Sequence, residues 1–162
     1  MLFKLNPKFL YLILIIIFAG CSDSQDVATP EKIGDKQRSA AISGNRAAQV
    51  INKMHDQSVA AVANVIAEYG QVRKDLLYIS SYANPEDAGK ALDLMIKKMA
   101  VVKKGPFAHL MPLAGYKKPV YFALGLGAAH YIYRSGNYLL WFQTYQSFAD
   151  KLPPRLLMLY PL

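Results

Sequence analysis

The sequence predicts an α+β domain in which two main helices pack on a mostly antiparallel sheet of about four strands. Three observations support this fold class: a helix with marked ends at residues 84–104, short β-rich runs through the second half of the chain, and a hairpin signal at Gly136-Asn137. The order of helix, strand, helix and then several strands favours helices on one face of a sheet. We assign this single domain to residues 44–162.

The first predicted helix spans residues 44–69. Apolar side chains recur there at helical spacing, and alanines, which are strong helix formers, fill the second half: Ala47, Ile51, Met54, Val62, Val65 and Tyr69 share one face. After Gln57 the residues also alternate as a strand would, so either structure fits that part. Residues 70–75 read as a turn, and the β-favouring run 76–82 as a strand.

The second predicted helix, residues 84–104, has the clearest ends. Asn84 suits the N-cap, Pro85 the first helical position, and Glu86 and Asp87 place negative charge at the positive end of the helix dipole. A buried stripe follows at helical spacing, and Gly105-Pro106 ends the helix: Ala88, Leu92, Met95, Met99 and Val102 form the stripe.

The remaining residues predict strands. Residues 108–113 form a short strand interrupted at Pro112, and residues 120–123 begin another. Residues 130–134 and 138–145 form a hairpin, in which Tyr131 opposes Phe142 on one face and Ile132 opposes Trp141 on the other. Residues 146–162 add a short helix or remain irregular, because Pro153, Pro154 and Pro161 interrupt them.

The N-terminus carries a targeting signal. Lys4 and Lys8 precede a 12-residue apolar stretch, which is too short to cross about 30 Å of hydrocarbon and has the length of a signal-peptide core. Ala19 and Gly20 before Cys21 resemble the lipobox of bacterial lipoproteins, although Phe18 stands where that pattern most often has Leu. The resemblance covers residues 1–21 only. An ordinary secretory signal or an uncleaved membrane anchor are the alternatives.

The resemblance implies a specific chain organisation. Residues 1–20 are removed as a signal peptide, Cys21 carries acyl chains including palmitate, and residues 21–43 form a lipidated cysteine with a flexible tether. Cys21 is the only cysteine, so acylation leaves no thiol for disulfides or catalysis. Ser22, rather than Asp, after the cysteine implies the outer membrane, facing the periplasm, where the organism has one.

Composition and motifs indicate no particular chemistry. The net charge of the chain is +8, and loss of Lys4 and Lys8 with the signal leaves +6, but the envelope location argues against nucleic acid. The Gly-x-Gly of residues 125–127 lacks the third glycine of a dinucleotide fingerprint. The three histidines, His55, His109 and His130, lie far apart in sequence. We therefore expect no catalytic residue, no cofactor and no metal.

A binding surface is the remaining functional hypothesis. Aromatic residues concentrate in the second half of the chain, and lysine pairs flank it: the candidate surface comprises Tyr131, Tyr133, Tyr138, Trp141, Phe142, Lys103, Lys104, Lys117 and Lys118. We expect a non-catalytic, lipid-anchored envelope lipoprotein that binds another envelope protein, or else an anionic envelope surface. The alternative is an envelope enzyme, such as a hydrolase, with a site assembled from dispersed residues.

Overall fold

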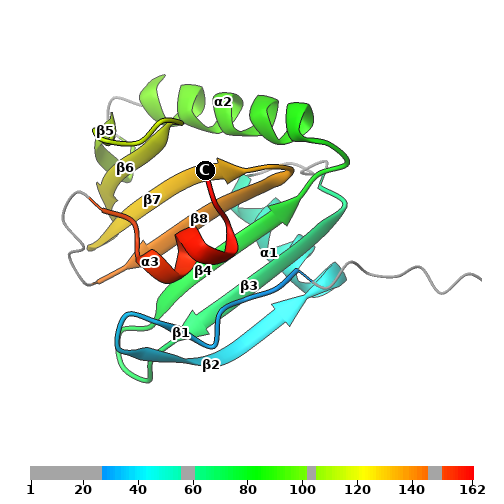
Figure 1. The fold of residues 1–162 in the computed structure, drawn as a ribbon, viewed down its shortest axis with the longest axis vertical. Coiled ribbons are helices and arrows are strands. Elements are labelled where there is room, and N and C mark those ends of the chain that lie inside the picture. Colours follow the sequence, from blue (N-terminus) through cyan, green and yellow to red (C-terminus); the bar gives the residue numbers. More distant parts are fainter. Residues whose placement is uncertain (1–26, 56–60, 102–104, 146–150) are drawn as a thin grey trace, which may run out of the picture.

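The computed structural model describes residues 27–55, 61–101, 105–145 and 151–162. These residues form an eight-stranded antiparallel half-barrel sheet with three short helices (Figure 1). The elements in chain order are β1 (Lys32–Ile33), β2 (Lys36–Ser43), α1 (Gly44–His55), β3 (Ala63–Tyr69), β4 (Asp75–Ser81), α2 (Pro85–Val101), β5 (Phe107–Pro112), β6 (Val120–Gly125), β7 (Ala128–Ser135), β8 (Tyr138–Thr144) and α3 (Pro154–Leu159).

The predicted fold of two main helices on about four strands is wrong, because the sheet dominates and three strands lie outside that prediction. The short β1 and the longer β2 occupy residues expected to be a flexible tether. Most of β2 is exposed, so it has no apolar alternation and joins the sheet through its backbone pairing with β3. β3 occupies the end of the predicted first helix, since pairing with β2 and β4 overrides the helical propensity of its alanines.

The strand order is β1-β2-β3-β4-β8-β7-β6-β5, and every neighbouring pair is antiparallel. β1 and β5 therefore form the two edges. Successive residues of a strand point to opposite faces of the sheet, and residues paired across strands share a face. One such row joins Ile66, Tyr78, Trp141 and Ile132. We call the face bearing this row the two-helix face, because α1 and α2 both pack on it.

The opposite face, which we call the α3 face, carries the larger core. Tyr69, Leu77, Tyr131 and Phe142 are fully buried there, and Leu156 of α3 packs among them. The Tyr160 hydroxyl donates to the carbonyl of Ala28, and the Ser135 hydroxyl donates to the carbonyl of Pro161 at 2.6 Å. The first bond joins the two described ends of the chain to each other, and the second attaches the C-terminal end to β7 (Figure 1).

Two predicted elements are confirmed in detail. The side chain of Asn84 caps α2, accepting the backbone N–H of Asp87 at 2.9 Å, and Ala88 and Leu92 are buried under the helix as predicted. The β7–β8 hairpin has the predicted register, with Tyr131 opposite Phe142 and Ile132 opposite Trp141. Residues 102–104, the predicted end of α2, lie outside the described residues, as do residues 1–26, which include the predicted signal peptide 1–20.

Candidate functional site

The aromatic residues of the candidate surface divide between core and boundary. Tyr131, Tyr133 and Phe142 have no exposed surface and belong to the core of the α3 face. Tyr138 and Trp141 are half-buried, on opposite faces of the sheet. Burial raises the pKa of Tyr133, whose hydroxyl has no hydrogen-bond partner in the described part of the chain. The five side chains therefore do not form one exposed aromatic patch.

The lysines of the candidate surface are only partly placed. Lys117 and Lys118 are exposed in the loop between β5 and β6, and within the described ranges neither forms an ion pair. Lys103 and Lys104 lie outside the described residues, as does the lipidation residue Cys21. Lys97 and Lys98 are exposed near the end of α2.

His130 is a structural residue. The indole Nε1–H of Trp141 donates to His130 Nδ1 at 2.9 Å, and because an indole can only donate, the imidazole proton resides on Nε2. Nε2 in turn donates to the carbonyl of Gly125 at 2.9 Å. Burial lowers the pKa of His130, and the bond to Gly125 opposes part of that shift. Both nitrogens of this neutral ring are thus occupied.

The other two histidines line hollows. His55, at the end of α1, borders a pocket between the two long helices. His109 is exposed on β5 with a positive φ of 55°, at a bulge in the pairing of β5 with β6. Among the residues that the structure describes, no carboxylate lines either hollow. The described residues include no group of three His, Cys, Asp or Glu side chains arranged to hold a metal ion.

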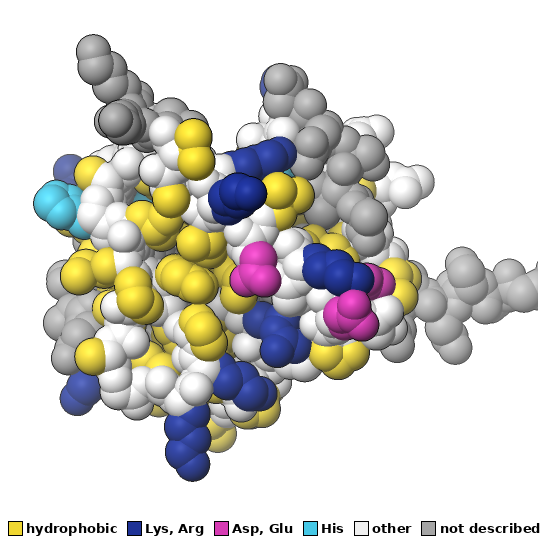
Figure 2. All heavy atoms as spheres, turned by 90° about the horizontal axis from the view of Figure 1, so that it is seen from above, with side chains coloured by type: hydrophobic (Ala, Val, Ile, Leu, Met, Phe, Trp, Pro, Cys, Tyr) yellow, Lys and Arg dark blue, Asp and Glu magenta, His cyan; other side chains and the backbone are white. Residues whose placement is uncertain are grey.

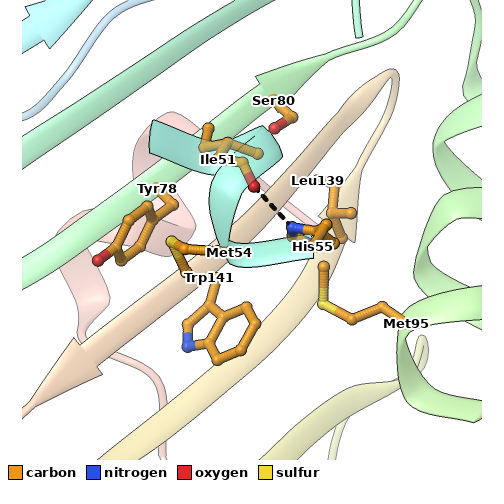
Figure 3. Close-up of a pocket in the computed structure, with 8 residues that line it drawn as sticks. All are labelled: Ile51, Met54, His55, Tyr78, Ser80, Met95, Leu139 and Trp141. Carbon is orange, nitrogen blue, oxygen red and sulfur yellow. Dashed lines mark hydrogen bonds between the residues drawn. The ribbon is translucent and has the colours of Figure 1, made fainter. Parts of the chain in front are cut away.

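The pocket between α1 and α2 lies above β4 and β8 on the two-helix face (Figure 3). Its cavity volume is about 20 Å³, and its lining combines two thioethers, an imidazole and two aromatic rings with smaller groups: Ile51, Met54, His55, Tyr78, Ser80, Met95, Leu139 and Trp141. Met54 and Met95 enter from opposite helices, with the indole of Trp141 between them in the view of Figure 3. We call this the inter-helix pocket.

A second hollow lies at the corner of the sheet formed by β5 and β6, on the α3 face. It is open to solvent, has a volume of about 610 Å³, and its lining includes Ala108, His109, Phe122, Leu124, Ala129 and Tyr145. Leu124 and Tyr145 are each more than 40% exposed, and Met111 and Leu126 beside them are more than 50% exposed. We call this the β5–β6 hollow.

Hydrophobic side chains also gather on the adjoining surface. Seen from above α2, they cover β5 and β6 beside the C-terminal half of the helix, with Lys and Arg side chains at the margins (Figure 2). β5 itself contains no Lys, Arg, Asp or Glu. An uncharged edge strand next to an apolar hollow is uncommon in natural sheets, which usually protect their edges with charge.

The sequence interpretation missed both hollows. Met54 and Met95 were assigned to buried helical stripes, and His55 was not paired with either, because only the tertiary fold brings α1 and α2 together. The signal for the β5–β6 hollow was present: the strand Phe107–Pro112 is mostly apolar, contains no Lys, Arg, Asp or Glu, follows Pro106 and ends at Pro112.

Comparisons with protein-family models, with curated proteins and with solved structures find no match to this chain. The described helices are all too short or too polar to cross a membrane.

Proposed function

We propose that this chain is a lipid-anchored protein of the bacterial cell envelope whose non-catalytic domain binds an apolar, acidic segment of another envelope protein in the β5–β6 hollow. The observation that supports the binding role is the combination of exposed Met111, Leu124 and Leu126 with an uncharged sheet edge. Contiguous exposed apolar surface is typical of interaction sites in soluble domains.

The charge at the other end of the β5–β6 strand pair indicates the chemistry of the partner. Lys117 and Lys118 stand exposed in the loop that joins β5 to β6, at the opposite end of these strands from the hollow, and no Asp or Glu of the described residues lines the hollow. A second copy of this chain lying along both strands would bring the same lysines together, and like charges are repulsive. A segment that places apolar residues in the hollow and acidic residues beside the loop fits both features.

Co-isolation from detergent-solubilised envelopes tests this proposal. The tagged full-length chain should retain its partner, and Lys117→Glu with Lys118→Glu should reduce the recovered partner at least about tenfold, because each buried or rim charge pair lost is replaced by repulsion. Lys32→Glu, an equally exposed change at the opposite edge, is the matched control and should leave recovery unchanged. Equal losses in both variants, or recovery of this chain alone as a dimer, would overturn the proposal.

The lipid anchor has its own test. We expect the wild type to incorporate labelled palmitate and to partition with detergent, because several acyl chains on Cys21 hold a protein in a membrane essentially permanently. Cys21→Ala should lose both properties while its domain stays folded by circular dichroism. Release of unlabelled wild-type protein into the soluble envelope fraction would contradict the lipoprotein assignment and leave the binding proposal standing.

A further inference from the structure

We propose that the inter-helix pocket binds a soft monovalent metal ion of the Cu⁺ class through Met54 Sδ, Met95 Sδ and His55 Nε2, against the indole ring of Trp141. This differs from the sequence-based expectation of no metal and does not depend on the proposed partner. The ion enters and leaves as Cu⁺, so no electron transfer is involved. The argument rests on the state of the imidazole, on the donor set and on the fixed indole.

The hydrogen bonding of His55 leaves one ring nitrogen for a metal ion. Its Nδ1 lies 3.0 Å from the carbonyl oxygen of Ile51, and because a carbonyl only accepts, Nδ1 carries a proton. A metal ion would therefore bind at Nε2, in place of any proton there. Metal-binding histidines characteristically donate their other ring N–H to a carbonyl or carboxylate in this way. His130 differs, since both of its nitrogens are engaged.

The remaining donors select the type of metal. Met54 and Met95 contribute thioether sulfurs from opposite sides of the pocket (Figure 3), and its lining among the described residues contains no carboxylate. Thioethers are soft ligands that favour Cu⁺, whereas Mg²⁺ and Ca²⁺ require oxygen ligands. Met54 is 47% exposed and Met95 half-buried, and the three rotatable bonds of each methionine allow its sulfur to move onto an ion.

Trp141 adds a fixed aromatic surface. Its Nε1–H bond to His130 and its tilted contact with Phe107, 5.4 Å between ring centroids, set the orientation of the indole. A cation over the face of an indole ring is attracted by the ring quadrupole. A monovalent ion also suits a pocket whose described lining offers neutral ligands, since it brings the smallest charge to be desolvated.

Silver titration tests the site, because Ag⁺ is a soft ion that undergoes no redox reaction under these conditions. The full-length Cys21→Ser protein in detergent contains no thiol, and Trp141 is its only tryptophan. We expect saturable quenching of its fluorescence by one Ag⁺ per chain. Combined Met54→Leu and Met95→Leu should weaken binding at least about tenfold, as should His55→Gln alone. Met158→Leu, at an exposed methionine of α3, should remain within about twofold of the parent.

The outcomes that would overturn the proposal are distinct. They are absence of saturable quenching, equal Ag⁺ affinity in the parent and the double-leucine protein, or Zn²⁺ binding as tightly as Ag⁺ at the same site. Leucine closely matches the volume of methionine, so loss of binding through unfolding is not expected, and circular dichroism checks this for each variant. Should the double variant unfold, Met95→Leu and His55→Gln decide the question separately.

Discussion

The two edges of the sheet differ in how well they are protected against a further strand. At the β1 edge, a strand of two residues is followed by Lys36 and Arg38 of β2, and the segment 27–33 bonds to Arg38, Tyr69 and Tyr160. At the β5 edge, a six-residue strand without charged side chains borders the exposed Met111 and Leu124. Short strands and charges block the addition of another strand or segment, so the first edge is closed and the second remains open to a partner.

The difference shows how one sheet can limit association to a single place. Near the β1 edge, Lys36 forms an ion pair with the buried Asp75, whereas the β5 edge has a bulge near His109 and ends at Pro112. A bulge disrupts regular strand pairing but leaves apolar side chains exposed. In the proposed complex, side chains rather than a long backbone ladder would therefore dominate contact with the partner at β5.

The largest expected effect concerns the closed edge. The carboxylate of Asp75 is fully buried, and its Oδ1 accepts from Lys36 Nζ at 2.8 Å and from the Tyr145 N–H at 3.1 Å. Lys36→Met leaves this carboxylate without its cation and should lower the free energy of unfolding by about 3 kcal/mol in urea denaturation. Lys74→Met breaks the exposed pair with Glu68 and should cost under about 1 kcal/mol. Similar losses would show that the Lys36 pair is not structurally important.

The second effect detaches the open edge. A Cβ at Gly125 would lie 2.5 Å from both Phe107 Cδ1 and the Pro106 carbonyl oxygen, so Gly125→Ala should cost about 2 kcal/mol and speed hydrogen exchange in β5. Gly89→Ala is the control: the nearest atom there is 3.9 Å away, and alanine in a helix is favoured by up to about 1 kcal/mol. Unchanged exchange in β5 would contradict this attachment.

A smaller effect depends on pH. His130 contacts Phe107 of β5, with ring centroids 5.0 Å apart, and its pKa is lowered in the folded protein. The contribution of neutral His130 to the free energy of unfolding is complete above the unfolded pKa of about 6.5. It is lost as the pH falls below that value, since the unfolded state binds the proton first. Stability should fall between pH 7 and 5 by at most about 1.4 kcal/mol per unit, and His130→Gln should reduce that slope. An unchanged slope would exclude His130 as its source.

Sequence patterns were informative where local chemistry determines structure. The α2 cap at Asn84 and the pairing of Tyr131 with Phe142 follow from residues close together in the chain. β2 could not be recognised from the sequence, because its exposed residues show no alternation of apolar and polar side chains. Its partner β3 also follows only after α1 in the chain. The inter-helix pocket was hidden for a related reason: Met54 and Met95 are 41 positions apart and meet only after β4 and β8 pair.

The open-edge account is tested most directly by photocrosslinking from both edges in intact envelopes. A photoreactive residue replaces Met111 at the β5 edge in one protein and Gln37, an exposed residue of β2, in the other. We predict an adduct with another protein from position 111 and little or none from position 37. Equal adducts from the two positions, or lipid adducts alone from position 111, would contradict the claim that the β5 edge is the protein-binding side of this domain.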